Sequence, residues 1–410
     1  TNLTQSTWYR VVLTSGVCTS VPTTAFQVVV TQPSESGTIS GTASLCMPTN
    51  TTALSLSGQT GSTITWQKAT ISNTTGAVGA FASISGATAA TYTTAAATPT
   101  AGPSKIAYRA IVKSGTCAAD TTSSYTVTIS PIVVTKAITG TASVCTGTNS
   151  ATLTLASGSV GTIQWQKSTN NSTWTNVGSP IAQTLATNAA SSITQTNLTQ
   201  STWYRVVLTS GVCASATTTA IKVTVYEPSV AGTITGTNGL CTPNTGSTLT
   251  LSGSTGTIAW YKASVTAGVT GTFAVLIGQT TPTLATGTLT STTAYKATVK
   301  SGACLAVSTE SHVISVSPSV VVKTITQNTT MPSGNALSTA LCLTDNSKIL
   351  TLGAGYIGSI QWQVSSGTAA SSTTGFVDIP GANASTYTIT NPTEGVNYFR
   401  VKLTSGVCSP

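Results

Sequence analysis

The side chains with the widest range of possible chemistry in this chain are nine cysteines, and their spacing decides what they can do. They form two series, each recurring at about one hundred residues: Cys46, Cys145, Cys241 and Cys342, then Cys18, Cys117, Cys213, Cys304 and Cys408. Zinc sites need cysteines in tight clusters, usually with histidine. No such cluster occurs here, and the chain has one histidine. The pattern therefore predicts disulfides and an oxidising compartment.

Each full repeat contains one cysteine of each series, so we expect each bridge to close its own domain. The expected pairs are Cys46 with Cys117, Cys145 with Cys213, Cys241 with Cys304, and Cys342 with Cys408. Cys18 is then left with a partner upstream of this sequence. Because each first cysteine precedes a strand and each second cysteine ends a hairpin, the bridges should tie sheet ends together. The loop that each bridge closes would contribute about 4 kcal/mol to the free energy of unfolding in the chain-entropy model.

Nothing else in the sequence predicts catalysis or cofactor binding. His312 is alone on a predicted closing strand, so no Ser-His or Cys-His arrangement is available. The seven carboxylates are scattered over different repeats, which argues against a glycosidase pair or an acidic calcium cluster. We therefore expect no catalytic, cofactor-binding or metal site, and no enzyme.

The net charge of +9 does not indicate a nucleic-acid-binding surface. Only 6% of residues are charged, against about 25% in an ordinary domain. Several basic residues recur singly at one position of the repeat: Arg10, Arg109, Arg205, Lys296 and Arg400. This periodicity predicts a solvated position in each repeat rather than a basic patch. No apolar run reaches the length of about 18 residues that a membrane span requires.

Internal repetition dominates the sequence. Residues Thr1–Cys18 are identical to Thr196–Cys213. The repeat predicts a partial domain at 1–31, which holds only its C-terminal part, three domains at 32–131, 132–227 and 228–318, and a domain at 319–410 that lacks its last strand.

Each repeat reads as about seven short strands with alternating apolar residues and turns rich in Gly, Ser, Asn or Pro. This pattern predicts an all-β chain of tandem immunoglobulin-like sandwiches, one disulfide each, in an elongated array. The expected core aromatics are Trp66, Trp165, Trp260 and Trp362, with Tyr9, Tyr108, Tyr204, Tyr295 and Tyr398. Leu-x5-Tyr spacing at Tyr9, Tyr204 and Tyr295 predicts tyrosine corners, in which the hydroxyl bonds to upstream backbone. A second aromatic follows each Trp: Phe81, Trp174, Phe273 and Phe376.

The combined pattern G-x-I-T-G, L-C, L-T-L-x-G, G-x-I-x-W-Q and T-x-Y-R-x-x-V-x-S-G-x-C runs through the whole chain. It resembles the tandem Ig-like repeats of giant Bacteroidota surface proteins, including the gliding-motility adhesins and other substrates of the type 9 secretion system. The resemblance implies an extracellular, cell-surface adhesin or stalk. Its partners would be a surface or polysaccharide ligand and, during export, the secretion machinery.

A self-assembling extracellular filament or sheath is the alternative. The segment Thr23 to Val30 could complete the last domain of a neighbouring chain by strand addition, which would make self-association its defining interaction.

Overall fold

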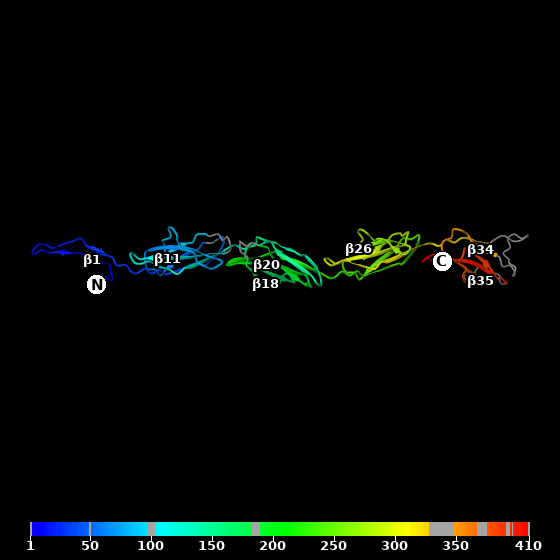
Figure 1. Cartoon of the computed structure of the whole chain (residues 1–410), viewed down its shortest axis with the longest axis horizontal. Helices are drawn as coiled ribbons and strands as arrows, with labels where there is room; N and C mark the ends of the chain where they lie inside the picture. The colour runs from blue at the N-terminus through cyan, green and yellow to red at the C-terminus, as the bar shows by residue number, and fades with distance from the viewer. Residues whose placement is uncertain are drawn as a thin grey trace. The chain divides into compact units, whose positions relative to one another are not determined.

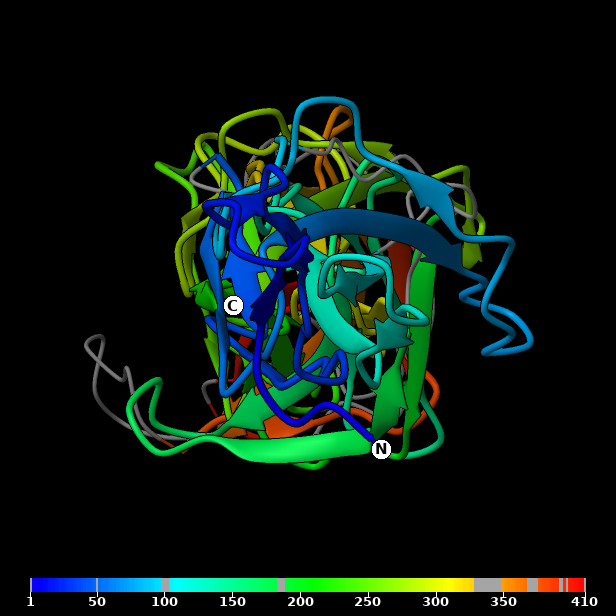
Figure 2. The same cartoon turned by 90° about the vertical axis from the view of Figure 1, so that its left-hand side faces the viewer.

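The computed structural model describes residues 2–48, 51–96, 103–182, 189–327, 348–366, 375–390, 394–395 and 397–408. All regular structure in these ranges is β-strand, as Figure 1 and Figure 2 show from two directions. No helix in them is long and apolar enough to cross a membrane. The chain divides into two compact units, Thr1–Val225 and Tyr226–Pro410.

The first unit contains two sandwiches. In the first sandwich, the sheet β10-β7-β5 faces the sheet β6-β13-β11-β8-β9, with β12 paired to β11. Its strands are β5 (Thr38–Ser40), β6 (Ser44–Cys46), β7 (Ala53–Ser57), β8 (Thr63–Ile71), β9 (Ala82–Ser83), β10 (Thr91–Thr93), β11 (Ser104–Lys113), β12 (Asp120–Thr121) and β13 (Tyr125–Ser130).

The second sandwich repeats this plan. The sheet β14-β16-β19 faces the sheet β15-β22-β20-β17-β18, with β21 paired to β20. Its strands are β14 (Ile138–Gly140), β15 (Ser143–Cys145), β16 (Ser150–Leu155), β17 (Thr162–Ser168), β18 (Thr175–Ile181), β19 (Ser191–Thr196), β20 (Thr202–Ser210), β21 (Cys213–Thr217) and β22 (Ile221–Tyr226).

The second unit also contains two sandwiches. In the first, the sheet β23-β25-β29 faces the sheet β24-β32-β30-β26-β27, with β28 paired to β26 and β31 paired to β30. In the second, the sheet β33-β34-β37 faces the sheet β36-β35-β38. The strands of the first are β23 (Thr233–Thr235), β24 (Gly239–Thr242), β25 (Thr248–Ser252), β26 (Thr257–Thr266), β27 (Val269–Thr270), β28 (Ala274–Val275), β29 (Thr283–Ala285), β30 (Thr293–Lys300), β31 (Val307–Ser308) and β32 (His312–Pro318). Those of the second are β33 (Ile325–Gln327), β34 (Lys348–Leu352), β35 (Ser359–Ser366), β36 (Val377–Asp378), β37 (Thr386–Ile389) and β38 (Asn397–Thr404).

Alternation along the strands builds each core. In β7 the two leucines are buried while Ala53, Ser55 and Ser57 are exposed, because successive side chains of a strand point to opposite faces. Leu54 and Leu56 meet Trp66 of β8 across the space between the two sheets. Equivalent clusters form around Trp165, Trp260 and Trp362. The prediction of an all-β chain of tandem Ig-like sandwiches is confirmed.

The N-terminal residues form two short hairpins of their own. β1 (Thr7–Tyr9) pairs with β4 (Phe26–Val28), and β2 (Val12–Leu13) pairs with β3 (Val21–Pro22). Their large apolar side chains are mostly exposed, including Trp8, Val12 and Phe26. These hairpins have no facing sheet among the described residues.

Candidate functional site

The disulfides join successive sandwiches, so the expected pairing within each domain is wrong. Cys46 bonds to Cys213, and Cys241 bonds to Cys408, each over a separation of 167 residues. Cys117 is a free thiol, so it does not bond to Cys46. Cys213 and Cys408 are likewise not bonded to Cys145 and Cys342.

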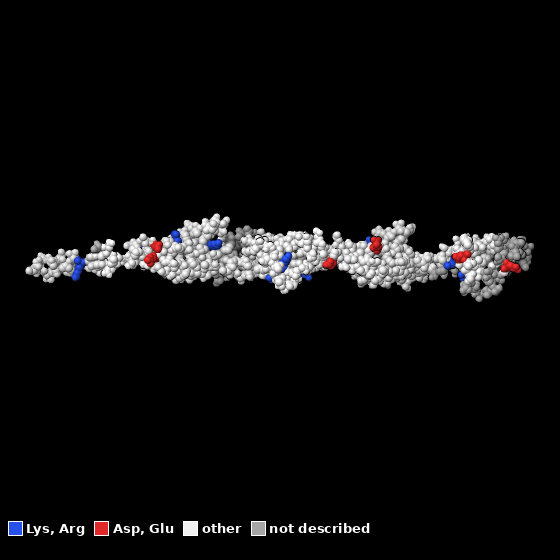
Figure 3. All heavy atoms as spheres, turned by 90° about the horizontal axis from the view of Figure 1, so that it is seen from below, with Lys and Arg blue, Asp and Glu red and all other residues white. Residues whose placement is uncertain are grey.

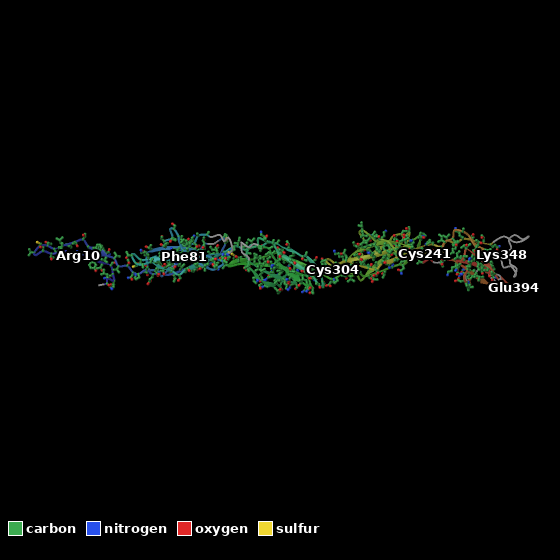
Figure 4. The ribbon with its side chains drawn as sticks, viewed as in Figure 1. Arg10, Phe81, Cys241, Cys304, Lys348 and Glu394 are labelled. Atoms are coloured by element: carbon green, nitrogen blue, oxygen red, sulfur yellow. A yellow bond between two sulfur atoms is a disulfide. The ribbon has the colours of Figure 1, made fainter. Side chains whose placement is uncertain are left out.

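Strand direction explains the correction. β6 runs parallel to β13, in a register that places Cys46 beside Ser130, where the chain leaves the sandwich. β11 runs antiparallel to β13, so the turn after it, which holds Cys117, lies at the opposite end. Figure 4 shows the same separation in the second unit, where Cys304 and Cys241 lie at opposite ends of one sandwich. A bridge within one domain would have to span the length of the sandwich.

The partner sulfur comes from the next sandwich. Cys213 Sγ lies 3.6 Å from the carbonyl oxygen of Ser130 and 3.3 Å from that of Pro131. Cys408 Sγ lies 3.6 Å and 3.4 Å from the carbonyl oxygens of Ser317 and Pro318. Both closing cysteines therefore sit against the last residues of the preceding sandwich, beside its first cysteine.

The other cysteines have different outcomes. Cys145 and Cys304 are each disulfide-bonded, which makes six bonded cysteines in the described chain, roughly one bridge per repeat. The expected bond from Cys241 to Cys304 is excluded, because Cys241 bonds to Cys408. Cys18 is an exposed free thiol, and Cys342 lies outside the described residues. This much disulfide bonding is typical of an extracellular protein.

A tight turn presents each closing cysteine. In the Ser-Gly-x-Cys sequence, the amide of Cys117 donates to the Ser114 carbonyl at 2.9 Å, and the amide of Cys408 donates to the Ser405 carbonyl at 2.8 Å. Gly211, in the turn before Cys213, has a φ of +50°, and a Cβ there would overlap the Ser130 hydroxyl. Glycine is thus required at this position for two reasons: the left-handed backbone conformation and the close approach to the preceding sandwich.

The structure buries all four expected tryptophans and three of the expected tyrosines. The buried residues are Trp66, Trp165, Trp260, Trp362, Tyr108, Tyr204 and Tyr295. Each indole N–H has an acceptor, and Trp66 donates to the Ala89 carbonyl at 2.9 Å. Tyr398 is half-buried, while Tyr9 is 49% exposed.

The tyrosine corner is wrong for Tyr204 and Tyr295. Both hydroxyls are buried without a hydrogen-bond partner. The Thr202 hydroxyl, which lies near Tyr204, donates instead to the Gln200 carbonyl. Burial raises the pKa of both tyrosines, and it raises the pKa of Tyr108 to about 12.

Asparagines that the sequence analysis missed take over the role of the corner. Asn244 donates from Nδ2 to the Leu289 carbonyl at 2.8 Å and accepts from the Leu289 amide at 3.0 Å. Asn149 holds Leu198 in the same way, at 2.8 and 2.9 Å. The available signal was an asparagine three or four residues after a first cysteine, in Cys145-x3-Asn149 and Cys241-x2-Asn244.

A second recurring arrangement lies, in each sandwich, on the outer face of the sheet that carries the core tryptophan. Arg109 donates from Nε to Gln67 Oε1 at 2.7 Å and stacks its guanidinium over Phe81, 4.1 Å from the ring centre. Three other repeats carry the same stacked pair: Arg205 on Trp174, Lys296 on Phe273, and Arg400 on Phe376. The periodic basic residue and the second aromatic of each repeat therefore meet, which the sequence analysis did not predict.

The basic residue and its cross-strand neighbour vary together from repeat to repeat. Where lysine replaces arginine at Lys296, the cross-strand neighbour is Tyr261 instead of glutamine. The lysine Nζ then lies 5.8 Å from the Tyr261 ring centre. A guanidinium can donate a directed hydrogen bond and stack at once, whereas an ammonium is a point charge that both rings can share. We call these four positions the cation–aromatic sites.

Within the part of the chain that the structure describes, the remaining titratable residues do not assemble into a reactive centre. His312 Nε2 lies 3.1 Å from the Thr237 carbonyl oxygen. Asp120 accepts from the Ser36 amide at 2.8 Å, and the Ser36 hydrogen bonds lower the pKa of its carboxyl. Across the described residues no three His, Cys, Asp or Glu side chains gather as metal ligands would. Lysines, arginines and carboxylates lie scattered over the surface seen in Figure 3.

One open polar pocket of about 640 Å³ lies in the second sandwich. Its lining includes Lys167, Asn170, Gln195, Thr202 and Tyr204. These groups offer hydroxyl, amide and ammonium contacts. The pocket contains no carboxylate pair, so the lining does not match the acid and base of a glycosidase.

Comparison with solved structures returns chains of low sequence identity and low TM-score. The crystal structure of the chicken CNTN1 FN1–FN3 domains is 12% identical, over 69% of this chain and 99% of that one, with a TM-score of 0.28. A marsupial T cell receptor is 13% identical, over 65% of this chain and 98% of that one, with a TM-score of 0.33. No curated protein matches.

One family matches most of the sequence. It is described as a domain of unknown function, DUF8696, and it matches residues 35–131, 134–227, 230–318 and 332–410. These four matches cover well over half of the chain, and each contains one Trp-centred core. The chain is therefore a repeat protein of Ig-like sandwiches that belongs to the DUF8696 family.

Proposed function

We propose that this chain is a non-enzymatic stretch of an extracellular adhesin or stalk at a bacterial cell surface, in which disulfides join each sandwich to its neighbour. The observation that carries the proposal is the pairing of Cys46 with Cys213 and of Cys241 with Cys408. A bridge between successive domains takes the segment that links them out of the path of the force, and a bridge inside one domain does not. The resemblance to Bacteroidota surface repeats supports attachment or gliding as the setting and the type 9 secretion system as the export route.

The bridges change how the chain responds to tension. When a chain is pulled, force passes through the shortest covalent path. The Cys46–Cys213 bond removes residues 47–212 from that path, and the Cys241–Cys408 bond removes residues 242–407. A domain that unfolds inside either loop adds no length to the chain. The oxidised protein would therefore keep its reach under load.

Single-molecule force spectroscopy tests this role. The oxidised chain should extend without the evenly spaced steps of domain unfolding. After reduction, each unfolded repeat should add roughly 30 nm, because an extended residue spans about 3.3–3.6 Å. The double variant Cys46→Ser/Cys213→Ser should show the unfolding step of the first sandwich without reductant, whereas Cys145 keeps its own bond. Identical traces with and without reductant would contradict a mechanical role for the bridges.

Adhesion itself has a candidate surface in the cation–aromatic sites. They recur once per repeat on an outer sheet face and combine a half-buried ring with a positive charge. Together with the net charge of +9, this composition suits an acidic polysaccharide. Binding of alginate should weaken at least several-fold when Arg109, Arg205, Lys296 and Arg400 are all changed to Gln. Unchanged binding would leave the chain as a stalk without this adhesive face.

A further inference from the structure

The same eighteen residues occur twice in this chain in two different environments. In the second sandwich, Tyr204, Val206 and Leu208 are completely buried. At the identical positions near the N-terminus, Tyr9 is 49%, Val11 59% and Leu13 61% exposed. The sequence is the same, so the difference lies only in what covers it.

In the second sandwich the cover is the rest of the repeat. Tyr204, Val206 and Leu208 belong to a cluster with Leu153 and Leu155 of β16 and with Ile163 and Trp165 of β17. The β1–β4 and β2–β3 hairpins therefore present the inner face of a sandwich without its facing strands. A partner that buries this face must supply leucines and a tryptophan at the same spacing.

The edge of the N-terminal hairpin is also incomplete. In the first sandwich, β6 lies parallel to β13 and brings Cys46 into register with Ser130. In the third sandwich, β24 lies parallel to β32 and brings Cys241 into register with Ser317. In both cases the closing cysteine of the next sandwich lies 3.6 Å from the carbonyl oxygen of that serine, and the two cysteines are bonded.

Cys117 occupies this closing position without a bonded partner. Its Sγ lies 3.8 Å from the carbonyl oxygen of Thr31 and 3.4 Å from that of Gln32. Thr31 thus corresponds to Ser130 and Ser317. A Cβ on Gly115 would press against Thr31, as one on Gly211 would press against Ser130. The junction is therefore assembled as in the bonded sandwiches, apart from one cysteine-bearing strand.

We propose that Val29–Thr31 and Cys117 form an acceptor site for the Leu-Cys strand of another repeat of this family. That strand would lie parallel to Val29–Thr31, as Ser44–Cys46 lies along Thr128–Ser130, with its cysteine in register with Thr31. The remaining strands of the same repeat would cover Tyr9, Val11 and Leu13. This inference rests on the bridge geometry and goes beyond the mechanical role proposed above.

The bond itself forms by thiol–disulfide exchange. The Cys117 thiol and the incoming thiol are oxidised to one disulfide and lose two protons and two electrons. An external disulfide, such as oxidised glutathione, accepts both and becomes two thiols. The acceptor site supplies the alignment of the two sulfurs, and the redox buffer supplies the oxidant.

Disulfide mapping of the native protein tests the proposal. The protein is alkylated and digested without reduction, and the peptide linked to Cys117 is identified by mass spectrometry. We expect a peptide in which leucine directly precedes the bonded cysteine. A peptide from elsewhere in the same polypeptide identifies the preceding repeat as the donor, whereas the peptide containing Leu341-Cys342 from a second copy identifies chain-to-chain assembly.

Two variants make the test specific. Cys117→Ser should abolish the link to the Leu-Cys peptide, whereas Cys18→Ser should leave it in place. An alkylated Cys117 in the native, unreduced protein would overturn the proposal. So would a bond from Cys117 to Cys46 or to Cys18, because neither places a new strand along Val29–Thr31.

Discussion

At the scale of single residues, the polar groups that fix these loops are not the ones that the aromatic pattern indicates. Tyr295 buries its hydroxyl without a partner, while Asn244 makes two hydrogen bonds to the backbone of Leu289. An unpaired buried hydroxyl is costly, whereas an amide bonded to backbone on both sides holds two chain segments together. The asparagine therefore stabilises the loop, and the tyrosine contributes mainly its ring.

The two residues should respond oppositely to substitution. Tyr295→Phe should leave the free energy of unfolding unchanged or raise it by up to about 1 kcal/mol, because it removes an unsatisfied hydroxyl. Asn244→Ala should lower it by about 1–3 kcal/mol. Asn244→Asp, which keeps an acceptor and loses the donor to Leu289, should lie between them. Urea denaturation measures all three, and a clear loss in Tyr295→Phe would restore the tyrosine corner.

Buried tyrosines also set the alkaline limit of the fold. Burial raises the pKa of Tyr108 from 10.0 to about 12 and also raises the pKa of Tyr204 and Tyr295. The native state favours the neutral phenol, so this contribution to stability is complete below pH 10 and is lost as the pH rises toward about 12.

A spectroscopic titration follows this loss. The phenolate absorbance of Tyr108, Tyr204 and Tyr295 should appear together with unfolding, read from tryptophan fluorescence. Tyr108→Phe should move the unfolding to higher pH. If all tyrosines titrate near pH 10 while the protein stays folded, the phenols are not buried as described.

At the scale of elements, the Ser-Gly-x-Cys turn explains how one sandwich packs against the preceding one. Gly211 and Gly16 occupy the same position in identical sequence, with φ of +50° and +54°. A Cβ on Gly211 would overlap the Ser130 hydroxyl, whereas a Cβ on Gly16 would meet nothing within 4 Å. The pair therefore separates the cost of backbone conformation from the cost of close packing between sandwiches.

Alanine at the two glycines should have unequal effects. Gly16→Ala should cost only the left-handed conformation, about 1 kcal/mol. Gly211→Ala should cost more, because Ser130 must also move, and it should slow formation of the Cys46–Cys213 bond in a glutathione buffer. Calorimetry and timed thiol trapping measure these effects. Equal losses at the two positions would mean that the turn does not pack on Ser130.

Local residue patterns account for what the sequence could predict, and the topology of the strands accounts for what it could not. The strands and the four core tryptophans follow from alternation and repetition, which are properties of neighbouring residues. The cysteine pairing does not, because it depends on which end of the sandwich each strand reaches. Cys46 and Cys117 belong to one repeat, yet parallel pairing of β6 with β13 places Cys46 at the exit and antiparallel pairing of β11 places Cys117 at the entrance. The contact of Arg109 with Phe81 was missed for a similar reason, since Arg109 lies on β11 and Phe81 immediately precedes β9.

At the scale of the whole molecule, the bridges turn a string of separate domains into linked covalent loops. Each described bridge closes a loop spanning 167 residues, which contributes about 5 kcal/mol in the chain-entropy model. This exceeds the contribution expected for loops within one domain only slightly, because loop entropy grows slowly with length. The larger consequence is that a break in one domain does not separate the chain.

A single cleavage distinguishes the two bridging schemes. A specific protease site inserted between Ser123 and Ser124, in the exposed loop before β13, lies between Cys117 and Cys145. If each bridge closed its own domain, the cut would separate the chain on a denaturing gel without reductant. Because Cys46 bonds to Cys213 across the cut, we expect one band that splits only after reduction. In Cys213→Ser the same cut should release two fragments directly, and a site between Thr24 and Ala25, outside both loops, should release its fragment whenever Cys117 is also changed to Ser.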